Sequence, residues 1–132
     1  MLNIVLYEPE IPTNTGNIMR TCVATNTRLH LIEPLGFSLD EKSIKRSGVN
    51  YIDKLEYYVY KDFEDFKNKN KGTYYYFTRY GKKPHTSFDY KEEYQKNDIY
   101  LIFGKESTGI PRSILGSDLD HCMRIPMTSN VR

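Results

Sequence analysis

The sequence predicts an α/β domain in which a parallel sheet is flanked by helices on both faces. Segments typical of strands alternate with segments typical of helices along the chain, and several of the strands are apolar without polar alternation. Strands of a parallel sheet have this continuous apolar character because crossover helices cover both faces. The 132 residues contain no internal repeat and no Gly/Ser linker. We therefore expect one domain, residues 1–132, with a single core.

The N-terminal segment predicts a strand followed by a helix. The apolar run LNIVLY at 2–7 reads as a buried strand that ends in an acidic, proline-containing loop. The next segment predicts a helix with Thr13 or Asn14 as its N-cap and Asn26 as its stop. Cys22 lies on the apolar face of this helix.

The middle of the chain continues the alternation. Ser38 followed by Glu41 matches a capping box and predicts a short helix near 39–47. Asp62 is a candidate N-cap for a further helix that turns Phe66 inward. Strands are expected at 28–33, 57–60 and 73–78, and the tyrosines of the last two are expected in the core or an interface.

The last third contains the clearest buried strand, DIYLIFG at 98–104. A long polar loop at 79–87 precedes it, and a short helix near 111–115 and a strand at 122–126 follow it. Ligands of such sheets bind at the carboxyl ends of the strands. The loops of interest are therefore 8–17, 78–87, 104–111 and the tail from 126 onward.

Composition narrows the class of protein. Charged residues make up 27% and hydrophobic residues 39% of the chain, as in ordinary globular proteins. No apolar run is long enough to span a membrane. The N-terminus lacks the basic residues that begin a secretory signal. Cys22 and Cys122 belong to no metal-ligand cluster, so we expect reduced thiols, a cytoplasmic protein and no metal. The net charge of +2 does not by itself indicate nucleic-acid binding.

Two segments have the character of ligand sites. Asn14–Ile18 opens a helix directly after a strand, where free amides bind phosphate or ribose and Arg20 reaches the same ligand. A capped helix start with a surface arginine explains this segment equally well. FGKESTGIP at 103–111 places two glycines around Glu106, which indicates a tight loop whose backbone approaches a ligand. The phosphate-loop spacing is absent, and a plain polar turn is the alternative.

Taken together, the segments resemble the SPOUT superfamily of knotted RNA methyltransferases. Within it they are most similar to the small bacterial enzymes that methylate the ribose 2′-hydroxyl of the tRNA wobble nucleotide, position 34. The resemblance runs in order through MLNIVLYEPEIPTNTGNIMR, RLHLIEPLGF, FGKESTGIP and RIPM. It implies a deep trefoil knot in the C-terminal part, which is a rare exception to the rule that chains do not thread loops.

The resemblance also implies partners. The methyl donor would be S-adenosylmethionine, the product S-adenosylhomocysteine and the substrate tRNA, with no metal and no membrane. The enzyme would be a homodimer whose partner chain completes the site through its Asn14–Arg20 segment. The family continues past RIPM with a segment S-x-N-L-S and a helix, so we expect this chain to be truncated before its knot-forming tail.

The resemblance assigns roles to individual residues. Arg20 matches the catalytic arginine, as the base or as a stabiliser of the developing alkoxide. The residues expected to bind the cofactor are Phe77, Thr78, Gly104, Glu106, Gly109, Ile125 and Met127. Asn14 and Asn17 are expected to bind the RNA ribose beside Arg20. Arg46, Lys82 and Lys83, which belong to two basic groups of the sequence, are candidates for contacts with the RNA backbone.

Two other classes of function stay open. A non-catalytic RNA-binding module on the same fold would bind tRNA with steep salt dependence and without cofactor affinity. A metabolite enzyme on an unknotted, flavodoxin-like sheet would bind a phosphorylated ligand at Thr15–Asn17 and ignore RNA.

Overall fold

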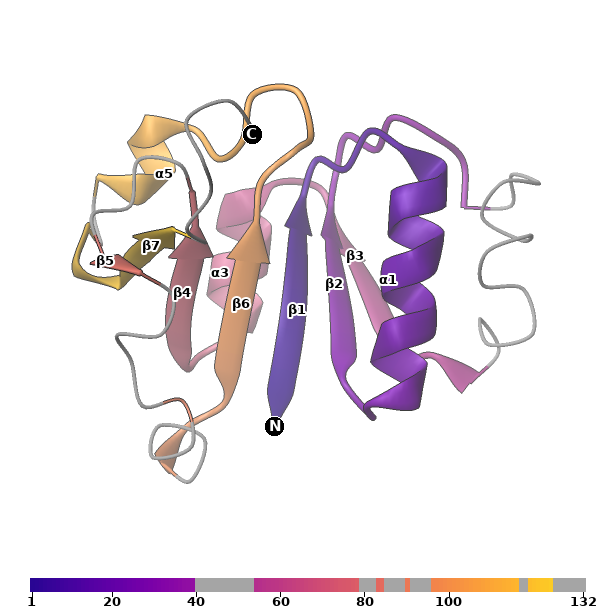
Figure 1. Cartoon of the computed structure of the whole chain (residues 1–132), viewed down its shortest axis with the longest axis horizontal. Helices are drawn as coiled ribbons and strands as arrows, with labels where there is room; N and C mark the ends of the chain where they lie inside the picture. The colour runs from indigo at the N-terminus through magenta and orange to yellow at the C-terminus, as the bar shows by residue number, and fades with distance from the viewer. Residues whose placement is uncertain (40–53, 79–82, 85–89, 91–95, 117–118, 125–132) are drawn as a thin grey trace.

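The computed structural model describes residues 1–39, 54–78, 83–84, 90, 96–116 and 119–124. Within them a seven-stranded sheet has the order β3-β2-β1-β6-β4-β7-β5, and every neighbouring pair is parallel (Figure 1). The strands are β1 (Leu2–Tyr7), β2 (Arg28–Ile32), β3 (Tyr57–Tyr60), β4 (Thr73–Phe77), β5 (Lys83–Pro84), β6 (Ile99–Phe103) and β7 (Cys122–Arg124). The predicted parallel sheet is confirmed.

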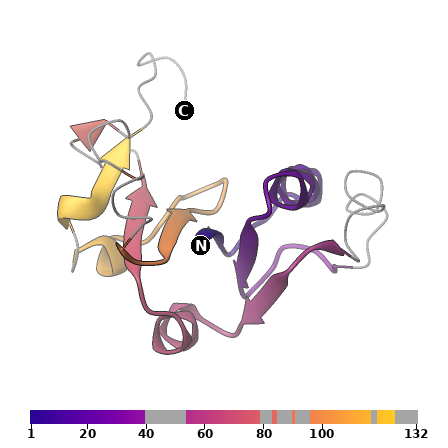
Figure 2. The same cartoon turned by 90° about the horizontal axis from the view of Figure 1, so that it is seen from below.

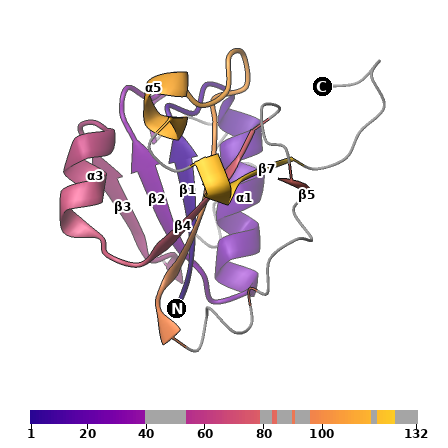
Figure 3. The ribbon, with the colours of Figure 1, turned by 90° about the vertical axis from the view of Figure 1, so that its left-hand side faces the viewer.

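Helices cover both faces of this sheet, as predicted. They are α1 (Pro12–Ala24), α3 (Phe63–Lys69) and α5 (Arg112–Leu115), with a 3-10 turn at Leu119–His121. Figures 2 and 3 show α1 on one face of the sheet and α3 on the other. The helix α5 packs on the α3 side, since Leu115 belongs to the same buried cluster as Phe66.

Most predicted elements are confirmed, with ends that differ by one or two residues. The strands expected in the middle and last parts of the chain correspond to β2, β3, β4, β6 and β7, and the short helix near 111–115 is α5. The polar loop expected over 79–87 contains β5, whose Lys83 and Pro84 pair with β7. Proline is tolerated there because β5 is an edge strand. The helix expected near 39–47 lies outside the described residues.

The helix α1 begins earlier than the sequence predicted. Its N-cap is Ile11, in an extended conformation, and Pro12 follows in the first turn. The prediction of Thr13 or Asn14 as the N-cap is wrong, because the fixed φ of proline favours the first helical position and starts the helix there. The predicted stop is confirmed, since Asn26 has a left-handed φ of 53°, which asparagine tolerates.

The helix α3 has the predicted cap. The side chain of Asp62 accepts a hydrogen bond of 2.8 Å from the backbone N–H of Asp65. Phe66, one turn further on, is fully buried. A capped first turn with an inward aromatic residue holds this short helix against the sheet.

The two faces of the sheet differ in chemistry. The buried cluster on the α3 face is largely aromatic and includes Tyr60, Phe66, Tyr74, Tyr76 and Tyr100. The cluster under α1 is aliphatic and sulfur-containing and includes Leu6, Met19, Cys22, Leu29 and Leu31. The predicted core role of the tyrosines is confirmed for most of them, whereas Tyr58 is 45% exposed because β3 is an edge strand.

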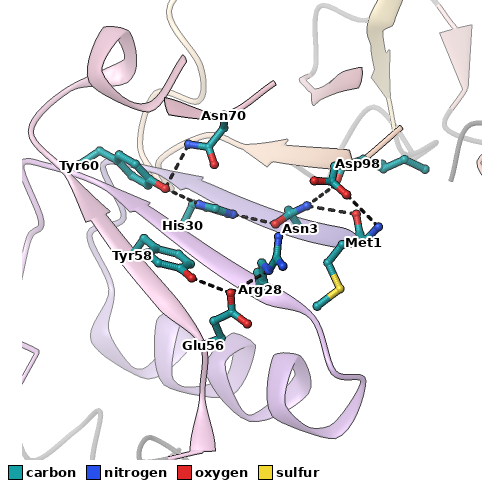
Figure 4. A network of polar contacts seen from close by, with 10 residues as sticks. Met1, Asn3, Arg28, His30, Glu56, Tyr58, Tyr60, Asn70 and Asp98 are labelled. Atoms are coloured by element: carbon teal, nitrogen blue, oxygen red, sulfur yellow. Dashed lines mark hydrogen bonds and ion pairs between the residues drawn. The ribbon is translucent and has the colours of Figure 1, made fainter. Parts of the chain in front are cut away.

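A buried polar network crosses the aromatic face (Figure 4). The amide nitrogen of Asn3 donates to the carbonyl oxygens of Met1 and Ile99, both at 3.1 Å. The side-chain oxygen of Asn3 therefore accepts from the Nε2–H of His30, 2.8 Å away. The other ring nitrogen, Nδ1, then accepts from the hydroxyl of Tyr60 at 2.8 Å. His30 is thus neutral and packed in the core, with both ring nitrogens satisfied.

Candidate active site at the carboxyl edge of the sheet

The strand order reverses between β1 and β6. From β1 the chain proceeds outward through β2 to β3, whereas β6 and β4 lie on the other side of β1. Connections that diverge from neighbouring parallel strands leave a crevice at their carboxyl ends, where ligands of such sheets bind. The two segments that leave this point are residues 8–11 after β1 and residues 104–111 after β6, and Figure 1 shows both at the top of the sheet.

The segment after β6 is the tight loop that its glycines predicted. A side chain at Gly104 would place its Cβ 2.3 Å from the carbonyl carbon of Gly109, which leaves no room for any other residue. The N–H of Gly109 donates to the carbonyl oxygen of Lys105 at 2.8 Å, and Gly109 has a φ of +73°. A Cβ built on Gly109 meets nothing within 4 Å, so its backbone is open to a ligand.

The two segments are joined by reciprocal hydrogen bonds. The carboxylate of Glu106 accepts from the backbone N–H groups of Glu10, at 3.0 Å, and Ile11, at 2.8 Å. In return, one carboxylate oxygen of Glu10 accepts from the N–H of Ser107 at 2.8 Å and from its hydroxyl at 2.7 Å. These bonds with Ser107 lower the pKa of the Glu10 carboxyl below its ordinary value.

An ion pair lies beside these bonds. The ammonium group of Lys105 is 3.4 Å from the carboxylate of Glu8, and both side chains are partly buried. Glu8 itself has a left-handed φ of 47° at the end of β1. Burial and the neighbouring Glu8 raise the pKa of Tyr7 to about 12. The phenol of Tyr7 is therefore protonated at neutral pH and does not serve as a base.

The exposed face of α1 carries the residues assigned to catalysis and RNA. Asn14, Asn17 and Arg20 are all exposed, and their spacing of three residues places them along one side of the helix. Thr15 and Gly16 are buried on the opposite side. Because α1 starts at Pro12, the N–H of Thr15 donates to the carbonyl oxygen of Ile11 at 3.2 Å, so the predicted free amides do not extend beyond Asn14.

The described residues assigned to the cofactor lie at one edge. Phe77 pairs in register with Phe103, and their rings stack at 4.6 Å with an interplanar angle of 9°. Thr78 follows Phe77 and donates its N–H to the carbonyl oxygen of Met123 in β7 at 2.9 Å. The carboxyl ends of β4, β6 and β7 are thus adjacent, which brings Phe77 and Thr78 to the same edge as Gly104.

Not every predicted site residue is brought to this edge by the described structure. Glu106 lies in the loop at this edge, but its carboxylate, assigned to the cofactor, accepts from the backbone N–H groups of Glu10 and Ile11. Lys83 lies in β5, at the far edge of the sheet from β3. Ile125, Met127, Arg46 and Lys82 lie outside the described residues.

Sequence reasoning missed the polar residues around the loop, Glu8, Glu10 and Ser107. Their partners in this region lie 96 or 97 residues away in the chain, so no local pattern marks them. A weak signal exists in the acidic segment EPE directly before a helix that has no capping side chain of its own.

Two negative findings apply to the part of the chain that the structure describes. Its side chains include no group of three or more His, Cys, Asp or Glu that could hold a metal ion. None of its helices has the length and apolar character needed to cross a membrane.

The fold defines the class of this protein as a parallel α/β domain, with a candidate ligand site at the carboxyl ends of β1, β4 and β6. The chain belongs to the SpoU rRNA methylase family, whose sequence model matches residues 1–132. A relative from Geobacillus stearothermophilus is 48% identical over 132 residues, which cover 99% of this chain and 83% of the relative. A relative from Escherichia coli strain K12, named tRNA (cytidine(34)-2′-O)-methyltransferase, is 42% identical over 134 residues, covering 100% of this chain and 82% of the relative.

Solved structures agree. One of them is described as giving insights into the 2-OH methylation of C/U34 on tRNA. It is 34% identical, with a TM-score of 0.87, and the match covers 100% of this chain and 84% of the solved chain. An AdoMet-bound rRNA methyltransferase from Sinorhizobium meliloti shares the fold, with a TM-score of 0.84 at 20% identity over 99% of this chain and 49% of its own.

Proposed function

We propose that this protein transfers a methyl group from S-adenosylmethionine to the ribose 2′-hydroxyl of tRNA nucleotide 34. The observation that carries the proposal is the match of the whole chain to the Escherichia coli enzyme named for this reaction. The match to the structure described for C/U34 methylation supports the same substrate. The geometry supports it as well, because the segments that carry the resemblance meet at one edge of the sheet.

The cofactor would be held at the carboxyl ends of β4, β6 and β7. When bound, S-adenosylmethionine supplies a methyl group that its sulfonium already activates. The described residues fit this group, since Phe77 offers a half-buried apolar ring and the open backbone of Gly109 permits close approach. Thr78 and Gly104 complete the described part of the site, with Ile125 and Met127 as its further members. The product would be S-adenosylhomocysteine.

Arg20 would act on the substrate ribose and its phosphate. A guanidinium remains protonated in proteins, so its role is to stabilise the developing alkoxide and not to remove the proton. Asn14 and Asn17, on the same face of α1, would hold the ribose beside it. Alignment of the reacting groups is the main contribution the protein makes, and it is worth roughly 7–11 kcal/mol of barrier.

The proposal includes the partners and the assembly. Arg46, Lys82 and Lys83 would contact the tRNA backbone. The enzyme would be a cytoplasmic homodimer in which the partner's Asn14–Arg20 segment completes the site.

Calorimetric titration with S-adenosylhomocysteine tests the cofactor. Two samples are needed, the 132-residue chain and the complete gene product. Binding by the complete product supports the cofactor assignment. Absence of binding by both samples overturns the cofactor assignment, and tRNA binding without cofactor affinity then favours a non-catalytic RNA-binding module.

Labelled methyl transfer tests the acceptor. The complete gene product is incubated with labelled S-adenosylmethionine and a tRNA transcript, and in parallel with the same tRNA carrying a 2′-deoxyribose at position 34. We expect label in the first tRNA and none in the second, because the acceptor oxygen is absent. Equal labelling of both tRNAs would place the acceptor elsewhere.

A further inference from the structure

We infer that Glu10, Glu106 and Ser107 form a clamp that positions α1 against the loop after β6, and that they are positioning residues for methyl transfer. The statement about methyl transfer rests on the proposed function. The clamp itself rests on the geometry of the two segments. It departs from the assignment of Glu106 to the cofactor that the family resemblance implies.

The clamp works in both directions. Glu106, in the loop after β6, accepts from two consecutive backbone N–H groups, those of Glu10 and Ile11. Glu10, before α1, accepts from both the N–H and the hydroxyl of Ser107. Each carboxylate therefore holds the main chain of the opposite segment, and a shift of one segment along the other breaks bonds at both ends.

The start of α1 depends on this arrangement. Ile11 has no polar side chain, Pro12 has no N–H, and no side chain within the helix caps it. The carboxylate of Glu106 supplies the missing acceptor and a negative charge at the positive end of the helix. The cap of α1 thus comes from a residue 95 positions away.

Further contacts hold each of the two segments that the clamp joins, the loop after β6 and the residues before α1. The loop after β6 is closed by the contact between Gly104 and Gly109. On the other side, a Cβ at Gly36 would lie 2.8 Å from the Cα of Glu10, and the N–H of Gly36 donates to the carbonyl oxygen of Pro9 at 2.9 Å. Because both segments are held in place, the clamp fixes the position of α1 relative to the loop after β6.

The position of α1 matters because of what it carries. Its exposed face holds Asn14, Asn17 and Arg20, and in the proposed homodimer this face completes the partner's site. The clamp fixes α1, and with it that face, on the protomer whose own loop carries Gly104 and Gly109. Loss of the clamp should therefore lower the rate of transfer, which depends on alignment, more than the affinity for either ligand.

Glutamine variants separate a clamp from a charged ligand contact. One oxygen of Glu106, Oε2, accepts the shorter bonds from both N–H groups, and one oxygen of Glu10, Oε1, accepts both bonds from Ser107. Glu106→Gln and Glu10→Gln each retain one such oxygen and lose the charge. Glu106→Ala and Glu10→Ala lose both.

The first experiment uses the complete gene product and measures kcat, the KM for tRNA and the Kd for S-adenosylhomocysteine. We expect each alanine variant to lose about tenfold or more in kcat, with the Kd within about threefold of wild type. The glutamine variants should recover most of the lost rate. Glu64→Ala, an exposed carboxylate in α3 on the opposite face of the sheet from α1, is the matched control and should change neither quantity.

The second experiment measures amide hydrogen exchange by NMR at Glu10 and Ile11, and it needs no activity. Exchange at both amides should accelerate in Glu106→Ala and stay slow in Glu106→Gln. Unchanged exchange in the alanine variant would show that the clamp does not form in solution, whatever the activity of the protein.

The outcomes distinguish the two proposals. A loss of about tenfold or more in S-adenosylhomocysteine affinity in Glu106→Gln would overturn the clamp role in favour of a direct charged contact with the cofactor. An unchanged kcat in Glu106→Ala would also overturn the positioning role. If the wild-type protein transfers no methyl group, the proposed function fails, while the exchange data still decide whether the clamp exists.

Discussion

Two residues, His30 and Arg20, illustrate how environment decides what a side chain does in this fold. His30 is 2% exposed, stacks against Tyr58 and Tyr60, and has both ring nitrogens in hydrogen bonds. Arg20 is exposed on α1 among polar neighbours. The residue type alone sets neither the packing role of His30 nor the proposed catalytic role of Arg20, and each role predicts a measurable effect.

The buried His30 should make stability depend on pH. Burial first, and the positive charge of Arg28 second, lower the pKa of His30 to about 4, with an opposing effect of Glu56. The unfolded chain, with an ordinary pKa of about 6.5, binds a proton that the folded protein excludes, so the stability present above pH 6.5 is lost as the pH falls toward 4. We expect a loss of about 2 kcal/mol between pH 7 and pH 4.5 from this group.

Urea unfolding at both pH values measures this loss. His30→Gln, which cannot be protonated, should be less stable at pH 7 and should show a smaller change between the two pH values. The same pH dependence in wild type and variant would contradict the assignment to His30.

Replacement of Arg20 should separate catalysis from cofactor binding. In Arg20→Ala methyl transfer should fall by about 10²-fold or more, because the charge that stabilises the alkoxide is lost. The Kd for S-adenosylhomocysteine should stay within about threefold, since Arg20 lies on α1 and not on the cofactor loop. Single-turnover transfer and calorimetry give the two values. Equal losses in both would refute this division of roles.

At the scale of elements, the loop after β6 has a backbone geometry that depends on two glycines. Its two glycines are required for different reasons. Gly104 has no space for a side chain, whereas Gly109 has space but a left-handed backbone.

Substitution of the two glycines should therefore have different costs. Gly104→Ala should destabilise the protein by roughly 1–3 kcal/mol or more, because its Cβ meets backbone atoms that cannot move aside. Gly109→Ala should cost about 1–2 kcal/mol, from φ alone. Chemical denaturation of both variants measures the order, and a Gly109→Ala variant less stable than Gly104→Ala would contradict it.

The helices at this scale show why α1 and α3 were not equally predictable. In α3 the cap, Asp62, and the amide it accepts from are three residues apart, and the prediction is confirmed. In α1 the cap is Glu106, which lies far along the chain. A local cap can be recognised from spacing, whereas a remote one cannot.

At the scale of the whole molecule, the parallel sheet gathers segments from the entire chain at one edge. The loop after β1, the loop after β6 and the end of β4 meet there, although they lie up to about a hundred residues apart. The residues proposed to contact tRNA likewise come from segments that are far apart in the sequence, so this proposal is tested on the whole molecule.

The proposed backbone contacts should appear in the salt dependence of tRNA binding. Each phosphate contact adds about 0.7–0.9 to the slope of log Kd against log salt concentration. A variant with Arg46, Lys82 and Lys83 all replaced by alanine should therefore lose roughly two from this slope. Filter binding over a series of salt concentrations measures it, and replacement of three exposed lysines of α3 and its flank, Lys61, Lys67 and Lys71, is the control. An unchanged slope in the first variant would remove these residues from the interface.

Local sequence signals were sufficient to predict many elements of this fold. Apolar runs predicted β1 and β6, the capping pattern at Asp62 predicted α3, and Asn26 predicted the end of α1, because each signal and its cause lie within a few residues of each other. The glycines at 104 and 109 likewise predicted a tight loop.

Other features depended on contacts between distant segments. The neutral His30 and the exposed Tyr58 on an edge strand follow from the neighbours that the sheet supplies. The clamp of Glu10, Glu106 and Ser107 follows from the reversal of strand order between β1 and β6, which brings two loops together. Hydrogen bonds and burial are properties of pairs of groups, so where the members of a pair are remote in sequence, only the folded chain decides them.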